Sequence, residues 1–255
     1  MKPLPLNTSA LRIAAWCGPA LVVLFFLGLV AIAGYIPPPS PSASAEQIAS
    51  WYRENTTAIR IGLLVVSIGV ALQAPWGASI AVWTRRGESN YPVLTYTQLI
   101  CLGFTLVDAF FMAMVWGVAS FRPDEVAAES TRMWNDFGWL LYLWTWPPFS
   151  VWCLAIGLGI LWDKSGAPAF PRWFAYYNFW IAFLLIPAGL MIFFKHGPFG
   201  FNGLIAFWMP TAVFFVWMLV MTWMLLRAVS AEEARARVPS SSTPMDVAHG
   251  SAEHA

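Results

Sequence analysis

Six long stretches of this sequence carry no charged side chain, with the exception of a single aspartate. They extend from Arg12 to Glu46, Arg60 to Arg85, Glu88 to Arg122, Asp136 to Asp163, Arg172 to Lys195, and Lys195 to Arg227. A helix that crosses a bilayer needs about 20 predominantly apolar residues, and every stretch supplies them. Backbone groups inside lipid must be hydrogen-bonded within the protein, and the long alternation of a membrane β-barrel is absent. The stretches therefore predict six transmembrane helices.

The predicted fold is an all-α, polytopic membrane protein in which the six transmembrane helices form one bundle. Residues 1–11 are expected to be a cytoplasmic N-terminus, residues 12–230 the transmembrane domain, and residues 231–255 a disordered cytoplasmic tail rich in Ser, Pro and Ala. The helices are expected near residues 12–34, 58–84, 93–120, 137–162, 173–194 and 203–227.

Composition excludes several classes of protein and cofactor. Charged residues make up 11% of the chain and hydrophobic residues 59%, whereas soluble domains carry roughly 25% charged residues. A net charge of +1 gives no basic field for nucleic acid. No transmembrane stretch offers a pair of histidines, and the cysteines at 17, 101 and 153 have no CxxC spacing, so neither a metal site nor a cofactor is predicted. The lipid bilayer is the expected partner, and a membrane partner or a homo-oligomer is left open.

The distribution of Lys and Arg predicts the orientation of the bundle. Six crossings place both termini on one side, and this side carries nine of the 14 basic residues: Lys2, Arg12, Arg85, Arg86, Lys164, Arg172, Arg227, Arg235 and Arg237. The other side carries Arg53, Arg60, Arg122, Arg132 and Lys195. Because cytoplasmic loops hold the excess of Lys and Arg, we expect an integral inner-membrane protein with both termini in the cytoplasm.

The first helix has a second interpretation as a secretory signal. Lys2 and Arg12 precede its apolar run, which ends in the small-residue pattern Ala31, Ile32, Ala33. The run of about twenty residues is longer than the usual 7–15 of a signal peptide, and this favours a retained helix. Cleavage after the small residues remains the alternative.

Prolines recur in the second, fourth and sixth predicted helices, at Pro75, at Pro147 and Pro148, and at Pro210. The two expected inner loops also share Trp, a cation, Gly, an aromatic residue and Pro at the same offsets. This favours three helix hairpins related by a parallel repeat, although any short cytoplasmic turn uses such residues. Each proline removes a backbone hydrogen bond and kinks its helix, which either opens a cavity near the midplane or adjusts packing.

The expected outer loops contain two weaker candidate residues. Ser44 can cap a short helix over residues 45–55, which is expected to lie on the outer surface or to act as a lid. Asp136 ends an acidic loop over residues 121–136, which is either a solvated, self-paired segment or a vestibule for a cation, and it can cap the fourth helix. His196, the one histidine before the tail, lies in a Gly- and Pro-rich turn and is most simply an ordinary loop residue.

Asp108 is the strongest candidate for a functional residue. It is the only charged side chain between Glu88 and Arg122, just past the centre of the third helix. An ionisable group at that depth is costly and commonly marks a proton carrier, a general acid or a ligand anchor. The structural alternative is a neutral acid that pins the helix to a neighbour, worth about 1 kcal/mol. Gln73 and Asn178 are the other polar candidates inside the membrane.

Aromatic side chains crowd the fourth helix. Tyr142 and Trp146 share one face of it, together with Trp139. The simpler interpretation is packing against lipid and at the interface. The functional interpretation is an aromatic pocket for an apolar ligand or for a cation held over the rings.

Three functions are compatible with these residues. The first is a small carrier or binding protein for an apolar or weakly charged molecule, and it predicts a cavity that reaches Asp108 from one side. The second is an intramembrane enzyme, such as an isomerase acting on a lipid-like substrate, with Asp108 as the acid. It predicts that Gln73, Asn178 or a tyrosine lies within hydrogen-bond reach in a closed aromatic pocket. The third is an accessory or scaffold subunit. It predicts no cavity, Asp108 tied to a neighbouring helix, and an exposed stripe formed by Ala155, Gly157 and Gly159.

Overall fold

The computed structural model describes residues 6–88 and 90–237, and every regular element in these ranges is a helix. The elements are α1 (Thr8–Phe26), η1 (Leu27–Ile32), α2 (Ala45–Ala71), α3 (Gln73–Arg85), α4 (Val93–Phe121), α5 (Ala128–Trp144), α6 (Trp146–Leu161), α7 (Arg172–Leu184), η2 (Ile186–Phe193), η3 (Gly197–Phe199), η4 (Leu204–Trp208) and α8 (Met209–Arg237). They combine into six spans long and apolar enough to cross a membrane, which confirms the predicted all-α bundle of six transmembrane helices.

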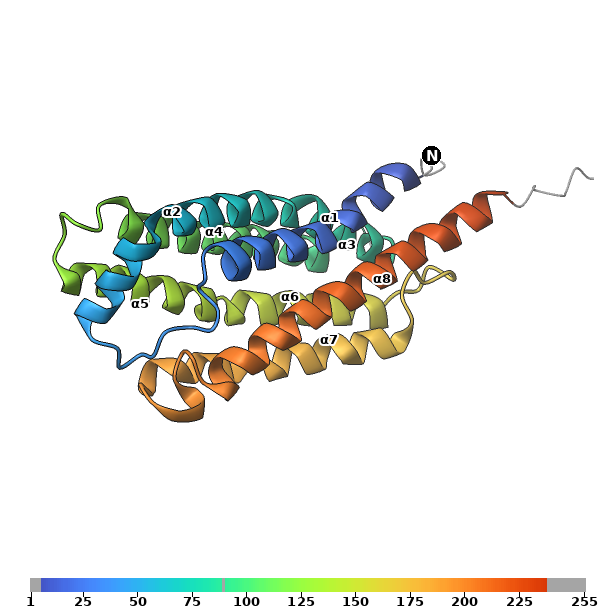
Figure 1. Ribbon diagram of the computed structural model, residues 1–255. Coiled ribbons are helices and arrows are strands. Elements are labelled where there is room, and N and C mark those ends of the chain that lie inside the picture. Colours follow the sequence, from blue (N-terminus) through green and yellow to red (C-terminus); the bar gives the residue numbers. More distant parts are fainter. Residues whose placement is uncertain (1–5, 89, 238–255) are drawn as a thin grey trace, which may run out of the picture.

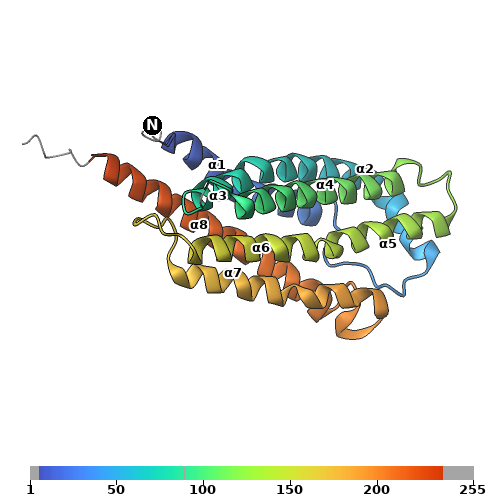
Figure 2. The same cartoon turned by 180° about the vertical axis from the view of Figure 1, so that it is seen from behind.

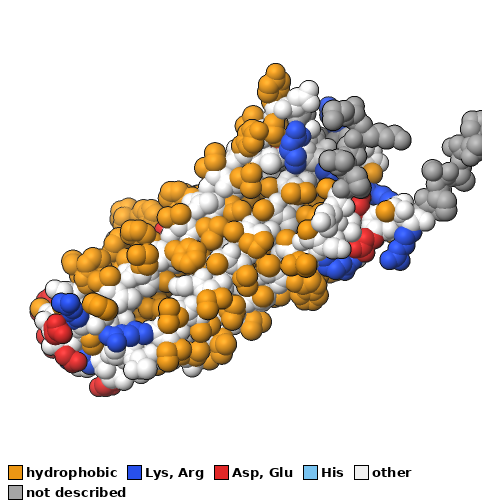
Figure 3. All heavy atoms as spheres, turned by 90° about the horizontal axis from the view of Figure 1, so that it is seen from above, with side chains coloured by type: hydrophobic (Ala, Val, Ile, Leu, Met, Phe, Trp, Pro, Cys, Tyr) orange, Lys and Arg blue, Asp and Glu red, His pale blue; other side chains and the backbone are white. Residues whose placement is uncertain are grey.

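The helices run along one long axis, so the molecule has two ends (Figures 1 and 2). The start of α1 and the end of α8 lie at the same end, which we name the terminal end; the opposite one is the distal end. Hydrophobic side chains cover the length between them, and charged side chains gather at both ends (Figure 3). Ile100 is 72% exposed and Phe183 65%. A continuous apolar belt of this kind is suited to lipid and not to water.

Prolines accompany the interruptions of the second, fourth and sixth spans, whereas Pro19 lies within the continuous helix α1. Proline at position i cannot bond the carbonyl of residue i−4 and clashes with it. α2 ends at Ala71, four residues before Pro75, and α5 ends at Trp144, four residues before Pro148. The sixth span starts with the short 3-10 helix η3, continues as the π-helix η4, and becomes a regular α-helix only at Met209, next to Pro210. α4 contains no proline and continues unbroken for 29 residues. The predicted parallel repeat of hairpins stays a prediction.

The second and fourth spans begin earlier than expected. α2 starts at Ala45 instead of near residue 58, so residues 45–55 do not form a separate interfacial helix. A capping box starts it: Ser44 Oγ accepts from the Gln47 N–H at 3.2 Å, and Gln47 Oε1 accepts from the Ser44 N–H at 2.9 Å. α5 starts at Ala128 instead of near residue 137, so Asp136 lies within the helix and does not cap it.

The predicted disordered tail begins too early. α8 continues to Arg237, so residues 231–237 are helical, and residues 238–255 lie outside the described part of the chain. The helix continues because its acidic side chains find basic partners on other helices. Glu233 pairs with Arg12 at 2.8 Å and Glu232 with Arg86 at 3.0 Å. These contacts join the ends of α1, α3 and α8 at the terminal end.

Candidate functional site

A cavity of about 120 Å³ lies inside the bundle between the two charged ends. All six spans contribute to its wall, and the interrupted regions around Gln73, Thr145, Leu185 and Pro210 all line it. The wall is mainly apolar and contains six aromatic side chains: Phe25, Tyr142, Trp146, Phe149, Phe214 and Phe215. The helix breaks and the cavity therefore occur at one level of the bundle.

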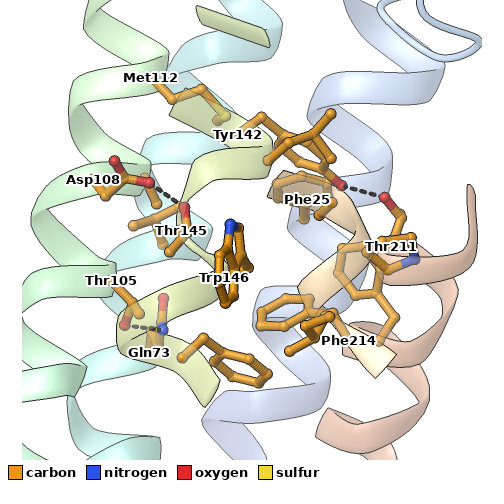
Figure 4. Close-up of a pocket in the computed structure, with 18 of the residues that line it drawn as sticks. Phe25, Gln73, Thr105, Asp108, Met112, Tyr142, Thr145, Trp146, Thr211 and Phe214 are labelled. Atoms are coloured by element: carbon orange, nitrogen blue, oxygen red, sulfur yellow. Dashed lines mark hydrogen bonds between the residues drawn. The ribbon is translucent and has the colours of Figure 1, made fainter. Parts of the chain in front are cut away.

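Three hydrogen-bonded pairs of polar side chains interrupt this apolar wall (Figure 4). Each pair joins two different spans and includes one threonine hydroxyl. The pairs are Asp108 with Thr145, Gln73 with Thr105 at 3.1 Å, and Tyr142 with Thr211 at 3.3 Å. In Figure 4 the indole of Trp146 stands between the first two pairs and the third. The cavity thus combines a large aromatic surface with a few polar groups, as small-molecule sites do.

Asp108 is the one acidic residue of the wall, and no Lys, Arg or His lines the cavity. It projects from the unbroken helix α4 toward Thr145, the residue at the junction of α5 and α6 (Figure 4). The ion pairs among residues 6–88 and 90–237 all lie near the ends of the bundle, and none includes Asp108. A carboxylate in such surroundings must bind a proton, a cation or further hydrogen-bond donors.

The hydroxyl of Thr145 has two competing acceptors. It donates to Asp108 Oδ2, and it also lies 3.1 Å from Leu141 O, one turn back in α5. A hydroxyl carries a single proton, so it donates to only one of them at a time. When Asp108 is ionised, Thr145 donates to the carboxylate. When Asp108 is protonated, its own O–H donates to Thr145 Oγ1, and Thr145 donates to Leu141 O. The site accommodates both protonation states without moving a heavy atom.

The Gln73–Thr105 pair joins the second span to α4. The Thr105 hydroxyl donates to Leu102 O at 2.9 Å, and its oxygen accepts from Gln73 Nε2. Gln73 is the first residue of α3, directly after the break at Leu72. The pair therefore fixes the broken second span against α4, and it leaves Asp108 as the acidic group of the cavity wall.

Four of the seven predicted site residues meet at the cavity, namely Asp108, Gln73, Tyr142 and Trp146. Asn178 does not. It is fully buried between α7 and α8, where its Oδ1 accepts from Trp217 Nε1 at 3.0 Å and its Nδ2 donates to Phe174 O at 2.8 Å. Those bonds use its amide to hold two helices together, which is a structural role.

Asp136 and His196 lie at the distal end, away from the cavity. Asp136 is half-buried and accepts from Asn135 Nδ2 at 3.1 Å. His196 is exposed in the turn before η3. The small residues expected to form an exposed stripe are buried instead: a Cβ on Gly157 would collide with the Phe179 ring of α7, and Ala155 and Gly159 also face inward. These residues serve packing inside the bundle.

Sequence reasoning missed Thr145, Thr211 and the phenylalanines of the wall. Thr145 offered a signal, because it directly precedes Trp146, Pro147 and Pro148, where proline leaves helix carbonyls without backbone donors. A hydroxyl beside such a break can bond the released carbonyl or a neighbouring helix. Thr211 directly follows Pro210 in the first turn of α8.

Comparisons with protein-family models, curated proteins and solved structures found no match to this chain. The fold and the cavity define its class as a multi-pass helical membrane protein with an aromatic, acid-containing cavity near the middle of its spans.

Proposed function

We propose that this protein is a small carrier or binding protein that holds an apolar or weakly charged molecule in the cavity beside Asp108. The observation that carries the proposal is the unfilled volume itself, which lies next to the one acidic residue between the charged ends. Native interiors are close-packed, so an aromatic cavity at the level of several helix breaks indicates a site kept open for a ligand.

The volume of the cavity limits the size of the ligand. An apolar cavity of about 150 Å³ in another protein holds a benzene-sized molecule. At about 120 Å³, this cavity fits a single small ring or a short branched chain. A larger ligand requires side chains of the wall to move.

The exposure pattern of α4 supports access from the bilayer. Phe104 is 59% exposed, Val107 64% and Phe111 51%, so these residues form a face directed to lipid. Asp108 is half-buried and adjoins this face while it also lines the cavity. The proposed route for an apolar ligand dissolved in the membrane is therefore from the lipid-facing side of α4 to Asp108, without passing through either charged end.

The contacts favour binding over the other two candidate functions. An acid-catalysed reaction needs a second group that exchanges protons with the substrate, and the side chain bonded to Asp108 in the described chain is a threonine hydroxyl. A scaffold role drew on an exposed small-residue stripe, and those residues are buried.

We further propose that the terminal end, with its excess of Lys and Arg, faces the cytoplasm and that the membrane is the inner membrane.

Two methionines of α4 provide a direct test. Met112 lines the cavity and is 2% exposed, whereas Met114 is 64% exposed on the lipid face. Fluorobenzene, titrated into purified protein with ¹³C-labelled methionine methyl groups, is expected to shift the Met112 signal saturably and to shift Met114 little. Ala109→Phe, which fills the cavity, should abolish the saturable shift, and Val107→Phe on the lipid face should preserve it. Equal, non-saturating shifts of both methyl groups would refute the proposal.

A further inference from the structure

We propose that the ligand is an organic monocation, such as a protonated amine, and that it binds in exchange for a proton on Asp108. This inference rests on the proposed binding function and names the chemical class of the molecule. It follows from three features of the cavity: its charge, its aromatic rings and the hydrogen bonds at Thr145.

The charge of the wall favours a cation. Asp108 contributes the one ionisable carboxyl group, and no basic side chain lines the cavity to neutralise it. The other titratable side chain of the wall is Tyr142, whose hydroxyl is paired with Thr211. The lining residues from α1, α2, α3, α6, η2 and α8 carry no titratable group. An anionic ligand would meet no cation here, whereas a protonated amine supplies the missing counter-charge and a hydrogen-bond donor.

The aromatic rings suit the apolar part and the charge of an organic cation. Six aromatic side chains face the cavity, and among them Tyr142 and Trp146 flank Thr145 on both sides of the α5–α6 junction. The faces of aromatic rings attract cations, with the largest effect in desolvated sites. A hydrated inorganic ion would find too few oxygen ligands, because the groups near Asp108 are mainly carbon.

The hydrogen bonds at Thr145 make the exchange of one proton for one cation possible. In the empty state Asp108 is protonated and donates to Thr145 Oγ1, while Thr145 donates to Leu141 O. When a cation binds, the proton leaves Asp108, and the hydroxyl of Thr145 turns to donate to Oδ2. Oδ1, which has no hydrogen-bond partner in the described chain, is then the acceptor for the ammonium group. One positive charge enters and one leaves, so the cavity stays neutral.

The exchange also changes a hydrogen bond to the backbone beside a helix break. Leu141 O gains or loses the Thr145 hydroxyl bond according to the protonation state, and Thr145 joins α5 to α6. Thr145 is therefore a positioning residue for the carboxyl group. Proton binding and cation binding would each favour a different arrangement at the junction, which is the coupling that a carrier requires.

The test uses two probes of nearly equal shape, benzylamine as the protonated cation and benzyl alcohol as its neutral counterpart. Binding is followed by the Met112 methyl signal, with Met114 as the internal control, and proton release is measured in weakly buffered solution. We expect benzylammonium to bind at least about tenfold more tightly than benzyl alcohol near pH 8, with release of a proton. The preference should decline as the pH is lowered, because protons compete with the cation for the carboxylate.

Variants separate this inference from the proposed function. Asp108→Asn is expected to lose both the preference for the cation and the proton release, while Asp136→Asn should retain both. Thr145→Val should shift the pH dependence of cation binding, and Thr145→Ser should restore it. If both probes bind equally to the unsubstituted protein and Ala109→Phe blocks both, the cation inference is wrong and the binding function stands. If neither probe shifts Met112 saturably, both proposals fail.

Discussion

Two regions of this bundle bury hydrogen-bonded polar groups, and they differ in what surrounds those groups. At the distal end, Tyr35 donates to the Tyr52 hydroxyl at 3.0 Å, and Tyr52 donates to Asn135 Oδ1 at 3.4 Å. All three side chains are at most 1% exposed. The rings of Trp116 and Trp139 pack against Tyr35, with centroids 4.3 and 6.1 Å away. Aromatic rings thus pack around the bonded hydroxyl groups, while Tyr35 also borders a separate hollow lined by Pro37 and Trp51. The distal network joins the loop after η1 to α2, α4 and α5.

The central cavity contains similar bonds beside an unfilled volume. Asp108, Gln73 and Tyr142 each bond a threonine of another span, yet all three also face the cavity. The comparison teaches that a buried polar group does not by itself indicate a functional site. Where aromatic rings fill the surroundings, the bonds specify the fold. Where volume is left open beside them, the polar groups are available to a ligand.

The largest expected contrast concerns two tryptophans. Trp116 is fully buried in the distal network, and its Nε1 donates to Asn135 O at 3.2 Å. Trp116→Ala is expected to lower the free energy of unfolding by about 3–5 kcal/mol, through lost packing and the loss of this hydrogen bond. Trp146→Ala should cost about 2 kcal/mol or less, because this ring is half-buried beside an existing cavity. Denaturant unfolding in mixed micelles measures both values.

Equal losses for the two tryptophan variants would remove the distinction between a packed network and an open site. The size of the aromatic probes that reach Met112 provides a second check. Trp146→Ala is expected to admit larger aromatic probes to Met112, whereas Trp116→Ala is not, because its ring belongs to the distal end.

A second contrast concerns two polar side chains. Asn135→Leu is expected to cost about 1–3 kcal/mol, because the Tyr52 hydroxyl and Asp136 lose their buried amide partner. Asp108→Asn keeps the shape of the side chain and an acceptor for Thr145 while it removes an ionisable group. Its free energy of unfolding should be unchanged or higher, since functional sites commonly sacrifice stability. A loss for Asp108→Asn as large as that for Asn135→Leu would identify Asp108 as a structural contact.

Sequence reasoning recovers the spans because the absence of charge is a local property. It fails at their ends, because helices continue beyond the membrane when a cap or an ion pair supports them. The capping box of Ser44 and Gln47 was visible in the sequence as a start signal for α2. The ion pair of Arg12 with Glu233 joins residues at opposite ends of the chain, and no local pattern predicts it.

The residues of the candidate site also divide into those that local sequence predicts and those that only the fold brings together. Asp108 stands out because its depth in an apolar stretch is local information. Its partner Thr145 lies 37 positions away, and only the packing of α4 against the α5–α6 junction brings the two together. Asn178 had the same sequence signal as Gln73, but the fold placed it against Trp217 in a filled region. Whether a buried polar residue faces a cavity depends on the packing of several helices at once.

The smallest expected contrast concerns two tyrosine hydroxyls. Tyr35→Phe removes a donor to Tyr52 at 3.0 Å and should lower the free energy of unfolding by about 1 kcal/mol near neutral pH. Tyr142→Phe removes a longer contact of 3.3 Å at the cavity wall and should cost about 0.5 kcal/mol or less. Unfolding at neutral pH in the same micelles distinguishes the two, and a larger cost for Tyr142→Phe would reverse the assignment of open and packed regions.

Alkaline pH sharpens the contrast at Tyr35. Burial, and then the neighbouring Tyr52, raise the pKa of Tyr35 well above its usual value, which is about 10 in unfolded chains. The folded protein therefore keeps this phenol neutral at a pH where the unfolded chain ionises it. Its contribution to stability is complete below about pH 10 and declines as the pH rises above that value. Tyr35→Phe should accordingly lose less stability than the unsubstituted protein between about pH 8 and pH 11. An identical loss in both proteins would show that the hydroxyl of Tyr35 ionises freely, and hence that the distal network is open to water.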